Sequence, residues 1–253
     1  MKNILTIILA IFLVGCGQQE SPFVPLEEYI QNPPKKDTTC IGDIRRAKAM
    51  VENGEIVFCY PFGLGSSELR QEKRLILLCK QHNLTFSYEL FGCVRVEGQR
   101  QGCFVAYMDK IIADKFGADF KQKLLAQADS MMVAANDTVL YYLCDEKPKM
   151  PYYYENEYFT RRVPIVEELR KQLKSDNEGK FPFMDIGFYI DKEGNASGYF
   201  LNHFYDANNK SNQRFKDELF NIGVEQLKQI ERWKSGIVNN QKVITKNNVR
   251  VYF

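Results

Sequence analysis

An apolar run near the start of the chain sets the first constraint on what the rest can fold into. Residues 4–14 are apolar apart from Thr6, and Lys2 places a positive charge just before them. The run is too short for a stable transmembrane helix, which takes roughly twenty residues. A short apolar run after a positive start is typical of a secretory signal peptide. We therefore expect residues 1–15 to be a signal peptide and the mature chain to fold outside the cytoplasm.

The residues that close this run carry a candidate modification site. The sequence Leu13-Val14-Gly15-Cys16 resembles the lipobox of bacterial lipoprotein precursors, in which a diacylglycerol is attached to the cysteine thiol. The resemblance implies a lipid on Cys16 that holds the protein on a membrane, since each buried methylene contributes about 0.8 kcal/mol. The alternative is an ordinary signal peptide followed by a chance cysteine. We expect a lipid-anchored protein of the cell envelope that faces the periplasm, and we favour the outer membrane over the inner one.

The overall charge argues against some classes of partner. The whole chain carries a formal net charge of +2, and loss of residues 1–15 removes only the positive charge of Lys2, which leaves +1. A near-neutral surface of mixed charge argues against nucleic acid or an acidic polymer as a partner. No second apolar run like residues 4–14 follows, so the lipid on Cys16 is the expected membrane contact.

The remaining cysteines all lie in the first part of the chain. Outside the cytoplasm six cysteines can form disulfides, in fifteen possible connectivities. Cys93 and Cys103 flank the expected turn of a hairpin at residues 97–102, so we predict a Cys93–Cys103 disulfide. Cys79 lies on the apolar face of an expected helix and is predicted to be a buried free thiol. The six are Cys40, Cys59, Cys79, Cys93, Cys103 and Cys144.

No cofactor or metal is expected. The chain contains no Cys-x-x-Cys pair, and His82 and His203 are its only histidines. A zinc site usually needs more ligands of these types at regular spacing. We therefore predict neither a metal centre nor another cofactor.

Composition shifts and turn residues divide the mature chain into three parts. Residues 16–39 are expected to comprise the lipid anchor and a polar, proline-containing tether. Residues 144–154 mark a boundary rich in charges, prolines and tyrosines. Residues 40–150 are predicted to be an α+β domain with a strand–helix–strand unit at its centre. Its helices are expected at 43–53, 68–82, 108–116 and 119–135, and its strands at 55–62 and 84–91. Gly54 suits the position after the first helix, and Ser66 or Ser67 could cap the second.

Residues 151–253 are predicted to form a second domain, so that the whole chain belongs to the α+β class. A helix is expected around 165–173, then a hairpin of 183–190 and 196–205 with Gly194 in its turn. An amphipathic helix at 212–231 follows. Residues 242–253 alternate apolar and polar side chains, which predicts a closing strand with one buried face.

The end of the chain resembles the TonB C-terminal domain, the family of bacterial energy transducers. That family carries Trp-Lys-Pro-Gly/Ala, a variable turn, Gly-Lys-Pro-Val and a closing strand that ends in Phe. Here Trp233-Lys234-Ser235-Gly236 leads to Asn240-Gln241-Lys242-Val243 and to Phe253 without a gap, and Asp191 to Gly194 matches the family's hairpin turn. Gly223 falls where the family has a small helix residue that lets the helix lie close to the sheet.

The resemblance covers residues 159–253 and departs from the family at three positions. Ser235 and Lys242 replace two prolines, and Asn240 replaces a turn glycine. The resemblance implies a hairpin–helix–strand fold with Trp233 in the core. Full energy transduction is not expected, because the family's inner-membrane helix and proline-rich span have no counterpart here. The alternative is that the fold serves only as a stable module.

The family's binding surface is an exposed strand edge that pairs with an extended segment of another protein. The closing strand, residues 242–253, is the best candidate for that edge here. A polar, cationic outer face also protects an exposed edge from unspecific pairing. The partner-binding candidates on this strand are Ile244, Lys246, Asn248, Arg250 and Tyr252.

Sequence motifs for catalysis are weak. The loop from Gly63 to Ser67 lacks the third glycine of a dinucleotide-binding fingerprint and the Lys-Ser/Thr of a P-loop. No Gly-x-Ser-x-Gly or His-Glu-x-x-His motif occurs. Three Asp-Ser/Thr-x triplets resemble acceptor sites of a bacterial periplasmic O-glycosylation system, and the candidates are Thr38, Ser130 and Thr138.

We therefore predict a non-enzymatic lipoprotein that acts as a protein-interaction module in the cell envelope and binds an envelope protein. The alternative, from another class, is an envelope enzyme or small-ligand-binding protein that uses the loop at 63–67. A concave pocket with convergent polar groups at that loop would favour the alternative.

Overall fold

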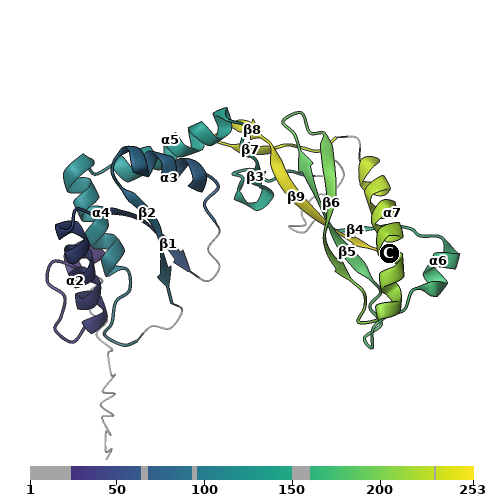
Figure 1. The fold of residues 1–253 in the computed structure, drawn as a ribbon, viewed down its shortest axis with the longest axis horizontal. Helices are drawn as coiled ribbons and strands as arrows, with labels where there is room; N and C mark the ends of the chain where they lie inside the picture. The colour runs from purple at the N-terminus through teal and green to yellow at the C-terminus, as the bar shows by residue number, and fades with distance from the viewer. Residues whose placement is uncertain (1–23, 64–67, 93–95, 150–159, 231) are drawn as a thin grey trace, which may run out of the picture.

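A computed structural model describes residues 24–63, 68–92, 96–149, 160–230 and 232–253. These residues form two lobes that meet at one end and diverge at the other, so that the molecule has the outline of an arch (Figure 1). We call residues 24–138 the first lobe and residues 139–253 the C-terminal lobe. Both lobes contain helices and strands, which confirms the α+β class.

The first lobe is built on two parallel strands that lie between two layers of helices. Strands β1 (Val57–Gly63) and β2 (Thr85–Phe91) pair in register along their whole length, and helix α3 (Glu72–Gln81) connects them. The predicted strand–helix–strand unit is therefore confirmed. The other helices are α1 (Leu26–Tyr29), α2 (Thr38–Glu52), α4 (Cys103–Phe116) and α5 (Phe120–Ala134).

Two apolar clusters explain this layering. On one face of the strands, Phe58 packs with residues of α3 and α5 such as Leu78 and Leu124. On the other face, Val57 and Cys59 pack against α2 and α4. The alternating side chains of β1 are thus buried on both faces, as expected for a parallel strand covered by helices.

Helix α2 begins earlier than its apolar spacing predicts. The buried carboxylate of Asp37 accepts a hydrogen bond of 2.9 Å from the backbone N–H of Cys40 and so caps the helix. An N-terminal cap of this kind satisfies a backbone donor that has no partner within the helix. Gly54 follows the C-terminal end with φ of +80°, as predicted.

The predicted Cys93–Cys103 hairpin and disulfide are wrong. Cys103 is the first residue of α4, and its sulfur is bonded to Cys40 in the first turn of α2, with 5.2 Å between their Cα atoms. The physical reason is that α4 packs across α2, which brings the two helix starts together. Cys93 lies outside the described residues.

The C-terminal lobe contains a mixed sheet with one face covered by helix α7 (Lys216–Lys228). The strand order is β3-β9-β5-β6, and β4 also pairs with β9. The strands are β3 (Val139–Leu140), β4 (Thr160–Arg162), β5 (Phe183–Ile190), β6 (Ala196–Tyr205) and β9 (Thr245–Tyr252). Smaller elements are the 3-10 helices η1 (Tyr141–Leu143) and η2 (Lys210–Phe215), helix α6 (Glu167–Gln172), and the paired strands β7 (Gly236–Val238) and β8 (Gln241–Val243).

The β5–β6 hairpin has the predicted bounds. Gly194 adopts φ of +92° in its turn, and a Cβ atom there would lie 2.2 Å from the carbonyl oxygen of Trp233. Trp233 is buried in the core, as predicted, and its ring packs against Phe188. On α7, a Cβ atom at Gly223 would lie 2.6 Å from the side chain of Ile186. Both glycines are therefore required for close packing.

Candidate functional site

The prediction that residues 242–253 form a free edge strand is wrong, because β9 has neighbouring strands on both sides. Strand β9 pairs with β5 over residues 245–252 on one side. On its other side it pairs with β3 at 245–246 and with β4 at 250–252. An alternating pattern shows which face of a strand is buried but not which strands are its neighbours.

The four candidate residues within β9 nevertheless lie together on one face of the sheet. Arg250 forms two hydrogen bonds of 2.8 and 3.0 Å with the carboxylate of Asp185 and stacks over a phenylalanine ring. Asn248 accepts a hydrogen bond from Asn202 of β6. The ammonium group of Lys246 lies over an aromatic ring of β6. These residues and Tyr252 alternate with the buried side chains of β9, so they occupy the sheet face opposite α7. Ile244 immediately precedes β9, and its carbonyl accepts a hydrogen bond from Val139.

Strand β6 is the last strand of the sheet among the described residues. Its pairing with β5 is interrupted by two register shifts, and Gly198 has φ of +62°. Bulges of this kind twist an edge away from new partners. The edge is therefore less suited to strand addition than a flat, regular strand.

A cavity of about 820 Å³ lies at one end of the C-terminal sheet. It is formed where β4, α6, the segment before β5 and the end of β9 meet. Its volume lies within the range of ordinary ligand sites, roughly 300–1,000 Å³. Its lining is cationic, aromatic and apolar, and consists of Arg162, Val163, Pro164, Arg170, Lys180, Phe181, Pro182, Phe183, Arg250, Tyr252 and Phe253.

Local structure explains why these side chains converge. Phe183 opens β5 and stacks on Tyr205 of β6, while Tyr252 ends β9 beside it. The guanidinium group of Arg250 lies 4.5 Å from the centre of the Phe183 ring. Phe181 remains 37% exposed although it is a large apolar residue. Exposed aromatic side chains around a cavity are common where a protein contacts a partner.

The chemistry of the lining suits the binding of anions and flat apolar groups. Among the lining residues above, no side chain carries a carboxylate, an imidazole, a thiol or an aliphatic hydroxyl group. General acid–base and nucleophilic catalysis rely mainly on those groups at neutral pH. Guanidinium groups and aromatic rings instead bind anions and flat apolar groups.

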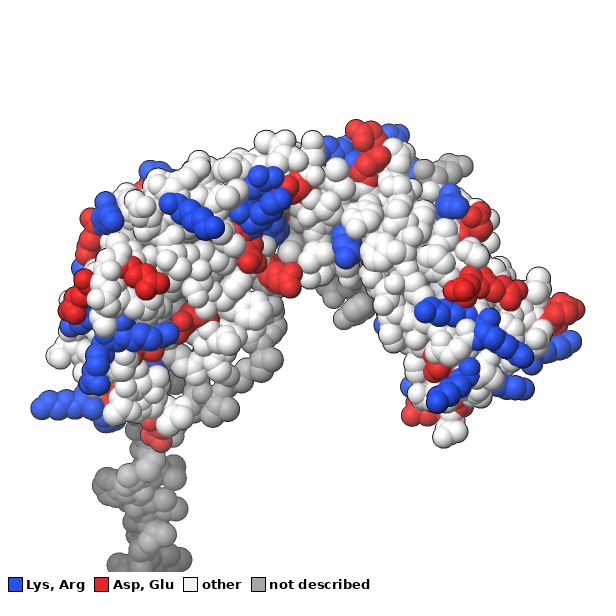
Figure 2. Space-filling view, in the orientation of Figure 1, with Lys and Arg blue, Asp and Glu red and all other residues white. Residues whose placement is uncertain are grey.

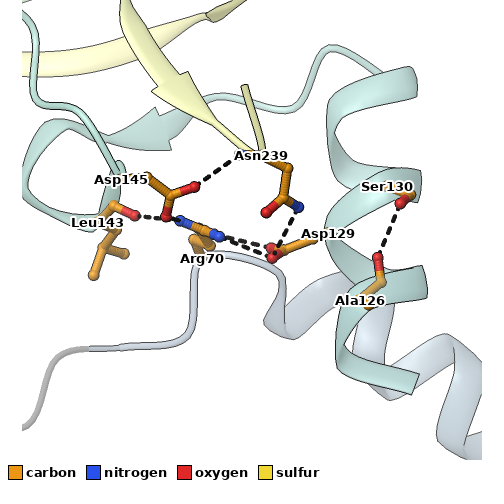
Figure 3. Close-up of polar contacts among 7 residues, drawn as sticks. All are labelled: Arg70, Ala126, Asp129, Ser130, Leu143, Asp145 and Asn239. Carbon is orange, nitrogen blue, oxygen red and sulfur yellow. Dashed lines mark hydrogen bonds and ion pairs between the residues drawn. The ribbon is translucent and has the colours of Figure 1, made fainter. Parts of the chain in front are cut away.

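The two lobes are joined at a network centred on Arg70, which sequence reasoning did not identify (Figure 3). Its Nε and Nη2 atoms donate to Asp129 of α5 at 2.9 and 2.8 Å. Its Nη1 atom donates to Asp145 at 2.6 Å and to the carbonyl oxygen of Leu143 at 3.0 Å. Asp145 in turn accepts a hydrogen bond of 2.7 Å from the backbone of Asn239, in the turn between β7 and β8. The Arg70 side chain thus connects α5 of the first lobe to the 143–145 segment of the C-terminal lobe.

The electrostatics of this junction follow from those hydrogen bonds. The carboxylate of Asp129 holds the pKa of Arg70 above its usual value, and Arg70 holds the pKa of Asp145 below its usual value. Both groups therefore stay charged at neutral pH. An apolar cluster beside them contains Met132, Val133, Val139, Cys144, Val238 and Val243.

The loop at 63–67 is only partly described, since residues 64–67 lie outside the described residues. The prediction that Ser66 or Ser67 caps the helix is wrong, because α3 begins at Glu72 and Gln71 occupies the N-cap position. A cavity of about 370 Å³ includes Tyr60, Glu68 and Arg70 in its lining. The donors of Arg70 are already occupied by the junction. A larger cavity of about 590 Å³ lies between α1, α4 and α5 and contains the Asp109–Lys121 ion pair.

The free thiols of the described residues are buried and poorly reactive. Burial raises the pKa of Cys59 to about 12 and those of Cys79 and Cys144 to about 11. Only the thiolate is a good nucleophile. The prediction that Cys79 is a buried free thiol is confirmed. His82 packs against the rings of Phe116 and Phe120.

The glycosylation candidates are all exposed, in different local structures. Thr38 begins α2, and Thr138 precedes β3. Ser130 lies within α5, where its hydroxyl donates a hydrogen bond of 2.9 Å to the carbonyl oxygen of Ala126 (Figure 3). Cys16 lies outside the described residues.

Comparison with known proteins gives no relative. No protein-family model, curated protein or solved structure matches the chain. Within the described ranges, no helix is long and apolar enough to cross a membrane. The same residues contain no group of three or more potential metal ligands.

Proposed function

We propose that the protein is a non-enzymatic lipoprotein of the cell envelope that binds a partner protein through its C-terminal lobe. The lipid on Cys16 anchors it, the mature chain faces the periplasm, and the outer membrane is the favoured location. The cavity at the end of the C-terminal sheet is the observation that carries the binding role. It offers cations and exposed aromatic rings without the groups that catalysis requires.

We also propose that the C-terminal lobe is a TonB-C-like module without the energy-transducing role. The order β5, β6, α7 and β9 supports this fold, as do the buried Trp233 and the close approach of Gly223 to the sheet. Binding in this module takes place at the cavity, since β9 is paired with β5 on one side and, at its two ends, with β3 and β4 on the other, and β6 is bulged.

A second candidate function is small-ligand binding by the first lobe. The cavity of about 590 Å³ between α1, α4 and α5 favours it. Lys121 lies there within 2.5 Å of Asp109 and also donates to the carbonyl oxygen of Cys59. These two polar groups are satisfied by each other, so they offer less to a ligand than the cations of the C-terminal cavity.

Lipid anchoring predicts a clear effect of Cys16→Ala. The variant should lose labelling by a fatty-acid analogue in growing cells and move from the membrane fraction to the soluble fraction. The reason is that the thiol of Cys16 is the proposed attachment atom. Cys79→Ala is the matched control, because its thiol is buried, and it should keep both properties. Continued labelling of the Cys16 variant would contradict lipidation at this residue.

The binding role predicts that Phe181→Ala reduces recovery of a partner from the envelope. Truncation of an aromatic anchor at an interface commonly costs at least about 2 kcal/mol, so recovery should fall by about tenfold or more. Affinity capture with the mature chain, followed by mass spectrometry, measures this. Leu90→Ala is the control, because Leu90 is 76% exposed and lies in the first lobe. Equal recovery by both variants would contradict binding at the cavity.

A further inference from the structure

We infer that the C-terminal cavity binds a segment of the partner protein that carries carboxylate side chains, and that Arg162 and Arg170 hold them. This inference rests on the proposed function and names the chemistry of its partner. It begins from the charges of the lining, which includes four cations and no acidic side chain.

Two of the four cations are already neutralised within the protein. Arg250 forms its paired hydrogen bonds with Asp185, and Lys180 lies 2.5 Å from a carboxylate oxygen of Glu178. Arg162 on β4 and Arg170 on α6 have no acidic partner in the part of the chain that the structure describes. Within the described residues, the cavity therefore has two guanidinium groups available for an anion.

The chemistry of these groups selects a carboxylate next to an apolar side chain. A guanidinium group offers a planar pair of donors that matches the two oxygens of a carboxylate. The guanidinium of Arg170 lies 5.9 Å from the centre of the Phe181 ring. A bound carboxylate there would place its neighbouring residues against Phe181 and Tyr252, both of which are exposed. An acidic segment with interspersed apolar residues satisfies both requirements.

The surroundings of the cavity favour a protein segment over an anionic membrane surface. Binding to a lipid surface depends on a broad cluster of Lys and Arg. Figure 2 instead shows acidic side chains mixed with basic ones on the end of the lobe that carries α6. Glu167 and Glu168 are exposed in the first turn of that helix and would be repelled by anionic lipids. The unpaired cations lie in a concave, aromatic-lined cavity, which suits inserted side chains.

The test compares two peptides that differ only in charge. The acidic peptide has the sequence Glu-Phe-Glu-Leu-Glu and the neutral one Gln-Phe-Gln-Leu-Gln, both capped and fluorescently labelled. The full mature chain carrying Cys16→Ala should bind the acidic peptide at least about tenfold more tightly in fluorescence anisotropy, since charge-assisted hydrogen bonds are lost in the neutral one. Added salt should weaken this binding, because the groups are partly exposed.

Two double substitutions test whether the preference for the acidic peptide depends on Arg162 and Arg170. Arg162→Gln combined with Arg170→Gln should abolish the preference for the acidic peptide. Lys171→Gln combined with Lys174→Gln removes the same charge from neighbouring residues outside the lining and should preserve the preference. Equal binding of both peptides, or binding of neither, would overturn the inference. The inference would also be overturned if phosphatidylglycerol vesicles bound the protein through both arginines while neither peptide bound. The partner-capture experiment tests the proposed function independently of the peptides. A captured partner would therefore still support the proposed function if the peptide experiment overturned this inference.

Discussion

Replacing Cys40 and Cys103 together with alanine should lower the free energy of unfolding of the first lobe by about 4 kcal/mol. The disulfide joins residues 63 positions apart, and a cross-link that closes a loop of this length restricts the unfolded chain by about that amount. The loop includes β1, α3 and β2, so the central unit of the lobe depends on it. Urea denaturation of the wild type, with and without a reductant, and of the double variant measures the effect.

The control for this experiment is a buried cysteine that forms no disulfide. Cys144→Ala should cost only about 1 kcal/mol, the scale of one small truncation in a core, and should still respond to the reductant. The reduced wild type and the double variant should have similar midpoints. A wild type that unfolds at the same urea concentration with and without reductant would contradict a stabilising Cys40–Cys103 bond.

Arg70→Met should destabilise the junction between the lobes by about 3 kcal/mol or more. The side chains of Arg70 and Asp129 are only 15% and 11% exposed, and removal of one partner of a buried ion pair commonly costs about 3–5 kcal/mol. The change leaves Asp129 and Asp145 charged next to each other without their shared cation. Hydrogen exchange of β7, β8 and the end of α5 should therefore increase, and the unfolding midpoint should fall.

A surface ion pair within the C-terminal lobe provides the control. Lys234 binds Glu146 at 2.8 Å, but both side chains are about half exposed, so Lys234→Met should cost no more than about 1 kcal/mol. Equal effects of the two substitutions would contradict a special role of Arg70.

The junction should also weaken in acid. The folded-state pKa of Asp145 lies below its usual value because Arg70 donates to it. A carboxylate with a lowered pKa stabilises the fold above its unfolded pKa of about 4, and this contribution is lost as the pH falls through the folded value. Arg70→Met should therefore show a smaller loss of stability below about pH 4 than the wild type.

Patterns in the sequence correctly predicted those elements whose structure depends mainly on residues that are close together in the chain. The β5–β6 hairpin was predictable because Gly194 and the residues around it require a tight turn. Helix α3 and its buried Cys79 followed from apolar spacing. The core position of Trp233 followed from the resemblance in the last part of the chain.

Contacts between distant segments were not predictable in the same way. Strands β3 and β4 have only two and three residues, so their sequences carry little signal, yet they occupy the side of β9 that was predicted to be free. The partner of Cys103 depends on how α4 crosses α2. From the sequence alone, Arg70 is expected to be an ordinary exposed residue. It forms its hydrogen-bond network only because the fold brings α5 next to the 143–145 segment. The cavity likewise combines residues from four separate segments.

Photocrosslinking at the cavity tests the binding role most directly. The photoreactive residue p-benzoylphenylalanine would replace Phe181 in the full lipid-anchored chain, and in a second strain it would replace Leu90, which is more exposed but lies in the first lobe. Irradiation of intact cells should yield a covalent adduct with one envelope protein at position 181 and none at position 90. Absence of an adduct at position 181, or the same adduct at both positions, would contradict a partner site at the C-terminal cavity.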